Sequence, residues 1–139
     1  MFRRILVPVD LSEKSLAAVD ITRECAAEAG AEVILLHVIE TVEHVRFDEL
    51  KAFYERLEIS SRKRLEILAE SFASEDLNVQ QVVIYGHRTK EIVNYAVSKG
   101  VDLIVMASHK MDLEHPAHDW SSISYAVAIL SPVPVLLVK

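Results

Sequence analysis

Metal-binding residue types are concentrated in one segment of the last third of the chain. Three histidines occur there with three carboxylates: His109, His115 and His118 with Asp112, Glu114 and Asp119. Two imidazoles spaced as H-x2-H, together with a carboxylate, can hold zinc, copper or nickel. Pro116 lies between these two imidazoles, so a helical register does not follow, and ligand types without known geometry are weak evidence. Metal binding by this loop therefore stays an alternative, and we predict no metal site.

Hydroxyl groups at a predicted helix start form a second candidate site. Ser121 and Ser122 precede an apolar segment, and the free N–H groups and dipole of a helix start favour an anion. The same serines are ordinary N-capping residues, which is the interpretation we favour. Lys110 could meet a phosphate as a point charge, although a lone surface lysine needs no such role.

Catalytic residue sets are not recognisable in the sequence. It contains no nucleophile elbow, no H-E-x-x-H motif and no paired carboxylates in a known frame. His37 follows an apolar run, and we predict a partly buried histidine bonded to a neighbour. Cys25 is predicted to be a small core residue. An enzyme is therefore the class of function with the least support.

The composition limits what the chain can build. Its 139 residues, 51% of them hydrophobic, suit one domain over residues 1–139. Gly30, Gly86 and Gly100 are the only glycines, so a glycine-based phosphate loop cannot form in the last third of the chain.

Charge and cysteine content narrow the partners and the compartment. Fifteen Lys and Arg against twenty-one Asp and Glu give a net charge of −6, which repels nucleic acid and anionic lipid. Asp10 interrupts the apolar run near the start, so we expect no signal peptide. A single cysteine cannot form an internal disulfide. We predict a cytoplasmic protein without nucleic-acid or membrane partners.

Nine elements must position these residues. Apolar runs that barely alternate predict strands at residues 5–9, 33–38, 103–107 and 133–138, and a weaker run predicts one at 79–85. Helical spacing predicts helices between them. They cover residues 12–29, ended by Gly30; 47–72, with one apolar stripe; 89–99, capped by Thr89 and ended by Gly100; and 122–130.

Strict alternation of strands and helices predicts an α/β protein with a doubly wound parallel sheet and helices on both faces. Ligands bind such sheets beyond the carboxyl ends of the strands. This rule points to three loops, at residues 10–12, 38–41 and 108–121.

Five phrases in the sequence resemble the universal stress protein family. They are ILVPVDLS at 5–12, LHVIE at 36–40, GHRTKEI at 86–92, VDLIVMASH at 101–109 and PVLLVK at 134–139. Together they span nearly the whole chain in the family's order. The resemblance implies a five-stranded sheet of order 3-2-1-4-5. It also implies a homodimer formed through the edge strand at 133–138, because an exposed apolar edge invites pairing.

The resemblance further implies a nucleotide site in the three loops. Asp10 matches the position that contacts adenosine, Val38 matches the position whose backbone meets adenine, and Ser108 and His109 lie in the loop after the fourth strand. ATP-binding members resemble one another in a pattern G-x2-G-x9-G followed by Ser or Thr. Here its glycines fall on Ala107, Lys110 and Ser121, with one extra residue, and Ser122 takes the hydroxyl position. Alanine is tolerable at the first of these places, but Lys110 and Ser121 each put a side chain near the path of the phosphates, where glycine would let backbone N–H groups approach.

Plain structural roles remain open for the same residues. Asp10 with Glu13 has the spacing of a capping-box variant, and Val38 ends a buried strand. We therefore predict a non-enzymatic stress-response protein that acts through dimerisation or an unidentified protein partner, and whose nucleotide cleft does not hold ATP well. An ATP- or AMP-binding sensor and a metal-binding protein are the alternatives.

Overall fold

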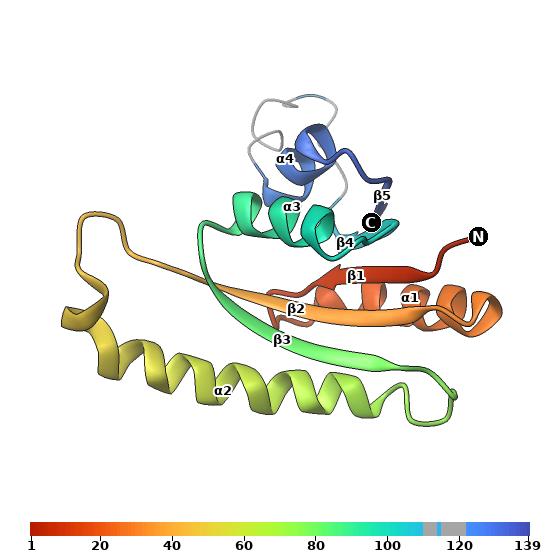
Figure 1. The fold of residues 1–139 in the computed structure, drawn as a ribbon, viewed down its shortest axis with the longest axis horizontal. Helices are drawn as coiled ribbons and strands as arrows, with labels where there is room; N and C mark the ends of the chain where they lie inside the picture. Colours follow the sequence, from red (N-terminus) through yellow and green to blue (C-terminus); the bar gives the residue numbers. More distant parts are fainter. Residues whose placement is uncertain (110–113, 115–121) are drawn as a thin grey trace.

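Five parallel strands form one sheet in the computed structural model, which describes residues 1–109, 114 and 122–139 (Figure 1). The strands are β1 (Arg4–Pro8), β2 (Glu32–Glu40), β3 (Val79–Gly86), β4 (Leu103–Ala107) and β5 (Val135–Val138). Their order across the sheet is β3-β2-β1-β4-β5, and each neighbouring pair is parallel. The predicted α/β class and the order 3-2-1-4-5 are confirmed.

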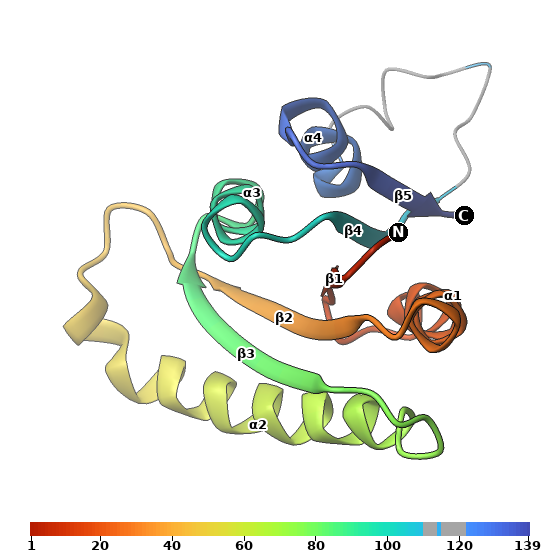
Figure 2. The same ribbon diagram turned by 45° about the vertical axis from the view of Figure 1, so that its right-hand side comes forward.

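Two helices cover each face of the sheet (Figure 2). On one face lie α1 (Ser15–Ala29) and α2 (Lys51–Glu70), and on the other lie α3 (Arg88–Ser98) and α4 (Ile123–Leu130). Both faces of the central strands are therefore dry, as the near-continuous apolar runs predict. Ile5 and Leu6 show this arrangement, since they are 0% exposed and belong to the cores on opposite faces. No helix in the described part of the chain is long and apolar enough to cross a membrane.

Glycines end α1 and α3 as predicted. Gly30 adopts the left-handed conformation (φ 66°), and Ala31 N–H donates to Ala26 O at 3.1 Å. Gly100 has φ 65°, and Val101 N–H donates to Ala96 O at 3.0 Å. In both cases the left-handed residue lets the chain turn back and satisfy a helix carbonyl.

The predicted starts of α1 and α3 are wrong. α1 begins at Ser15 rather than at residue 12, because the residues before it form a turn around Asp10. α3 begins at Arg88, and His87 is its N-terminal flanking residue, without a side-chain cap bond. Thr89 lies inside the first turn and is 8% exposed, so it does not cap the helix.

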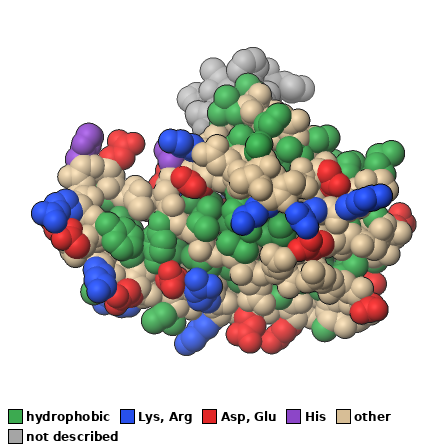
Figure 3. Space-filling view, viewed as in Figure 1, with side chains coloured by type: hydrophobic (Ala, Val, Ile, Leu, Met, Phe, Trp, Pro, Cys, Tyr) green, Lys and Arg blue, Asp and Glu red, His purple; other side chains and the backbone are tan. Residues whose placement is uncertain are grey.

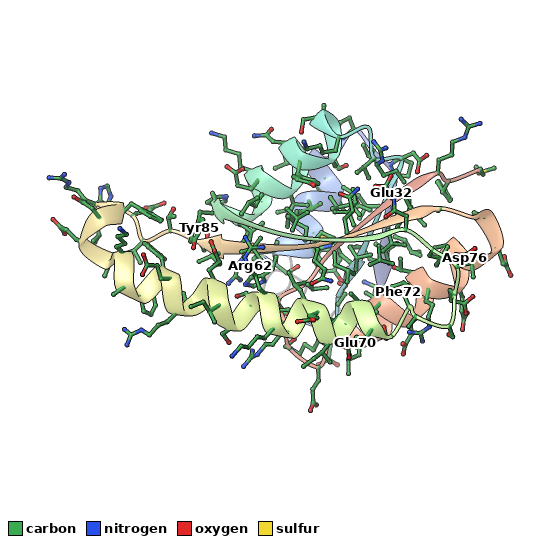
Figure 4. The ribbon with its side chains drawn as sticks, turned by 60° about the horizontal axis from the view of Figure 1, so that its bottom comes forward. Glu32, Arg62, Glu70, Phe72, Asp76 and Tyr85 are labelled. Atoms are coloured by element: carbon green, nitrogen blue, oxygen red, sulfur yellow. The ribbon has the colours of Figure 1, made fainter. Side chains whose placement is uncertain are left out.

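The prediction of one helix over residues 47–72 is also wrong at its ends. A short 3₁₀ helix, η1 (Phe47–Leu50), precedes α2, and Phe72 follows α2 in a turn. Phe72 nevertheless packs into the core, 2% exposed, below the sheet in Figure 4. The apolar stripe is only partly buried, since Leu57 is 36% and Phe47 50% exposed. α2 packs against β2 and β3, which lie at one side of the sheet.

Candidate functional site

A pocket of about 250 Å³ opens at the carboxyl ends of β1, β2 and β4. Its remaining walls come from the first turns of α3 and α4 and from the turn before α1. The apolar part of the lining consists of Pro8, Val9, Leu36, Val38, Ile92, Met106, Ala107 and Ile123. The polar part consists of Asp10, Lys14, Ser15, His37, Arg88, Ser108, His109, Ser122 and Ser124. The strand order reverses at β1, with β2 on one side and β4 on the other, so the pocket lies at the switch point of a doubly wound sheet.

Asp10 follows β1 and organises the turn that leads to α1. Its Oδ1 accepts hydrogen bonds from Ser12 N–H at 2.9 Å, from Ser12 Oγ at 2.6 Å and from Ser15 Oγ at 2.9 Å. Leu11 between them has a left-handed φ of 67°. The capping-box interpretation with Glu13 is wrong, because the partners of Asp10 are serines and α1 starts five residues after it.

The charge of Asp10 is stabilised by these contacts. Burial alone would raise the pKa of its carboxyl, but the hydrogen bonds from Ser12 and Ser15, with the charge of Arg88, lower it below the ordinary 3.8. Asp10 is therefore an anion at neutral pH, with one well-satisfied oxygen at the pocket.

Val38 and His37 bring β2 to the pocket. Val38 is 4% exposed and packs in the core on the α3 and α4 face. His37 is partly buried, and its Nδ1 lies 2.8 Å from Val9 O, which confirms the predicted bond to a neighbour. Since a carbonyl only accepts, Nδ1 carries the proton in this bond. Burial lowers the pKa of His37 and outweighs the bond to Val9, so the imidazole is neutral at pH 7.

Three serine hydroxyls lie in a chain between β4 and α4. Ser124 Oγ donates to Ser108 Oγ at 3.2 Å and lies 3.3 Å from Ser122 Oγ. Ser122 caps α4, as predicted, by accepting from Tyr125 N–H at 3.4 Å. The Ser108 N–H donates to Val138 O at 2.7 Å, so β5 occupies this backbone amide.

His109 is held where the chain leaves β4. Its carbonyl oxygen accepts from Tyr125 OH at 3.1 Å, and Lys139 Nζ lies 2.7 Å from the same phenol. Lys139 Nζ also lies 4.7 Å from the centre of the Tyr125 ring, which stabilises the cation. These contacts join the end of β5 to the first turn of α4 beside the pocket.

Several predicted residues lie outside the described part of the chain. They are Lys110, Asp112, His115, His118, Asp119 and Ser121. The metal alternative and the serine at the third glycine position therefore stay predictions. Within residues 1–109, 114 and 122–139, no group of three or more His, Cys, Asp or Glu is placed to hold a metal ion.

Sequence reasoning missed Arg88, Lys14 and Ser124 among the pocket residues. Arg88 Nε lies 3.5 Å from Glu40 Oε2, across the ends of neighbouring strands. The signal was available in part, because Arg88 lies in the phrase GHRTKEI directly after a strand. Its partner was not apparent, because 48 residues separate the two in sequence. The register that places Glu40 beside Gly86 brings them together.

Comparison with known proteins agrees with this arrangement. The model of the universal stress protein family matches residues 1–139. The chain belongs to this family. The universal stress protein YxiE of Bacillus subtilis is 30% identical, over 100% of both chains. The universal stress protein MJ0577 of Methanocaldococcus jannaschii is 29% identical, over 100% of this chain and 96% of its own.

Solved structures share the fold. The structure of MJ0577 superposes with a TM-score of 0.82 at 29% identity, covering 100% of this chain and 96% of that one. A universal stress protein in complex with cAMP (19% identical, TM-score 0.77; 99% and 97% covered) has the same fold. So does the Archaeoglobus fulgidus universal stress protein in complex with dAMP (16% identical, TM-score 0.72; 99% and 98% covered).

Proposed function

We propose that this universal stress protein is a non-enzymatic, cytoplasmic homodimer that acts in the stress response, and that its pocket binds an adenine nucleoside monophosphate better than ATP. The observation that carries the ligand class is the pocket itself. Its apolar walls, with Asp10 at one side and serine hydroxyls at another, match a flat base attached to a polar sugar phosphate. Its volume of about 250 Å³ lies near the lower end of the roughly 300–1,000 Å³ common for small-molecule sites.

The end of β4 offers little to a triphosphate. Ala107 takes the place of the first glycine of the ATP pattern and adds a Cβ. The next backbone N–H, that of Ser108, already donates to Val138 O at 2.7 Å. The β- and γ-phosphates could use this N–H as a donor only if its bond to Val138 O were broken, because a hydrogen-bonded amide is not a free donor. Both observations support the proposal that ATP binds weakly.

Two related proteins support the monophosphate class. The cAMP complex and the dAMP complex named above each hold an adenine ligand with a single phosphate. A pocket that binds adenosine through Asp10, Val38 and the serines Ser108 and Ser122 would use the same end of the sheet. A regulatory role without turnover agrees with the lack of a catalytic residue set in the sequence.

Calorimetric titration tests this proposal. AMP, ADP and ATP with magnesium are each titrated into the protein, and AMP should bind most tightly and ATP most weakly. Asp10→Ala should weaken all three. Asp20→Ala is the matched control, because Asp20 is exposed on α1 and pairs with Arg23 at 2.8 Å away from the pocket. Micromolar ATP affinity that exceeds the AMP affinity would overturn the ligand assignment, and so would no detectable binding of any nucleotide.

The dimer is proposed through β5. This strand lies at the edge of the sheet, and its Leu136 is 40% exposed. Ile129 and Leu130 of the neighbouring α4 are 77% and 62% exposed, and hydrophobic side chains are visible on α4 at the top of Figure 3. A free edge beside exposed apolar side chains favours association.

Light scattering tests the dimer. The expected mass is twice the 15.6 kDa of one chain. Leu136→Asp should shift the protein to the monomer, whereas Ile67→Asp should not, since Ile67 is 66% exposed on α2, on the other face of the sheet. A 15.6 kDa species alone at micromolar concentration would refute the homodimer.

A further inference from the structure

Arg88 is the one arginine among the described residues that line the pocket, and its ion-pair partner lies outside the lining. Arg88 lines the pocket from the first turn of α3, whereas its partner Glu40, at the end of β2, does not line it. Lys14 is the other described cation of the lining, and Asp10 is its described carboxylate. Among the described residues, the lining therefore carries two cations and one anion, although the chain as a whole carries a charge of −6.

The pair between Arg88 and Glu40 is easily broken. Its N–O distance is 3.5 Å, and the side chains are 40% and 42% exposed. Exposed ion pairs of this length contribute little to stability because water and salt compete with them. The guanidinium donates through five N–H groups, so a single long contact to Glu40 leaves most of its donors for another acceptor.

The charge of Arg88 reaches the neighbouring pocket residues. Burial and local hydrogen bonds have the largest effects on the pKa values of Asp10 and His37, and the positive charge of Arg88 lowers both. Asp10 follows β1 and His37 lies within β2, and both line the pocket, so the charge of Arg88 reaches lining residues from two strands.

We propose that Arg88 binds the anionic group of the pocket's ligand and that Glu40 competes for the same guanidinium. This inference rests on the proposed function and adds the residue that recognises the phosphate. A phosphomonoester carries up to two negative charges and accepts two parallel hydrogen bonds from arginine, so it outcompetes one distant carboxylate. In this arrangement a side chain of α3 binds the anion. It replaces the backbone phosphate loop after β4, for which the chain lacks the glycines.

Opposite effects of two substitutions test the proposal. AMP and adenosine are titrated into the wild-type protein, Arg88→Gln and Glu40→Gln. Arg88→Gln should weaken AMP about tenfold or more and leave adenosine within about twofold, because only AMP has the charged group. Glu40→Gln should tighten AMP by about twofold to fivefold, since it removes the competitor, with adenosine again unchanged.

The controls are Arg46→Gln and Asp48→Asn. Arg46 and Asp48 form an exposed pair at 3.1 Å that does not line the pocket. Each control substitution removes the same charge as its counterpart at Arg88 or Glu40, and neither should change the ratio of AMP to adenosine affinity. Equal weakening of AMP and adenosine by Arg88→Gln, or weaker AMP binding by Glu40→Gln, overturns the role of Arg88 while the proposed function stands. If the wild-type protein binds neither ligand, both proposals fail.

Discussion

Replacing Asp10 by alanine should destabilise the turn between β1 and α1. The substitution removes the oxygen that accepts from Ser12 N–H, Ser12 Oγ and Ser15 Oγ at 2.6–2.9 Å. Ser15 is only 2% exposed, so its hydroxyl loses a buried acceptor. The left-handed Leu11, at φ 67°, also loses the contacts that hold it in place.

The expected loss is about 2 kcal/mol. A bond to a charged acceptor is worth roughly 1.5–3 kcal/mol when shielded from water, but Asp10 itself is exposed and one oxygen serves all three donors. The three bonds therefore cannot simply be added. Asp10→Asn retains an acceptor oxygen and should cost about 1 kcal/mol. Asp20→Ala, which loses an exposed pair, should cost less than about 0.5 kcal/mol.

The pH dependence separates charge from shape. Because the pKa of Asp10 is lowered in the folded protein, its stabilisation is present above the unfolded-state value of about 3.9 and is lost as pH falls through the folded value. The difference in free energy of unfolding between wild type and Asp10→Asn should therefore shrink below about pH 4.

Urea denaturation at pH 7 and along a series down to pH 3 measures these quantities. Asp10→Ala should lower the midpoint at unchanged m-value, equivalent to a fall in Tm of about 8 °C. A free energy of unfolding for Asp10→Ala within about 0.5 kcal/mol of wild type at pH 7 would contradict the stabilising role of the carboxylate. A difference between wild type and Asp10→Asn that stays constant across the pH series would contradict the role of its charge.

Two further predictions concern the stability of the fold. Gly30→Ala should lower the free energy of unfolding by about 1 kcal/mol. The whole loss comes from the left-handed φ of 66°, since a Cβ there meets nothing within 4 Å. Gly30→Asn should lose less stability, and equal losses of the two variants in thermal denaturation would contradict this cause. Tyr54→Phe should cost about 1 kcal/mol because Val42 N–H, 2.9 Å from the phenol oxygen, loses its acceptor, while the ring keeps its stacking on Phe47 at 4.8 Å. Hydrogen exchange should accelerate at Val42 in Tyr54→Phe, and an unchanged rate there would argue against the bond.

Local sequence patterns predicted the elements well where one physical requirement dominates. The apolar runs identified the strands because both faces of the parallel sheet are covered, as Ile5 and Leu6 show by facing opposite cores. Gly30 and Gly100 end their helices because the left-handed conformation excludes most side chains. Ser122 caps α4 as predicted. For the two glycines and Ser122, the residue and its partners lie within a few positions of one another.

Helix starts were less predictable because several polar residues compete for the same few N–H groups. Thr89 had the type of a cap, but it lies in the first turn of α3 and is buried. Asp10 had the type of a capping-box residue, but Ser12 and Ser15 offered nearer donors. Phe47 and Leu57 fitted the apolar stripe predicted over residues 47–72, yet both remain partly exposed. The spacing of apolar residues along a helix does not show how far the sheet beneath it extends.

The alternation of strands and helices could be predicted from the sequence alone, and its motifs indicated the family and the strand order. It also located three loops that meet at one end of the sheet. Only the tertiary structure decided which side chains share the pocket. Arg88 and Glu40 meet because β2 and β3 are neighbours in register, and Ser108 and Ser124 meet because α4 returns to the end of β4. Such contacts depend on where segments far apart in the sequence lie in space. Residue type and local spacing carry no information about the distance between those segments.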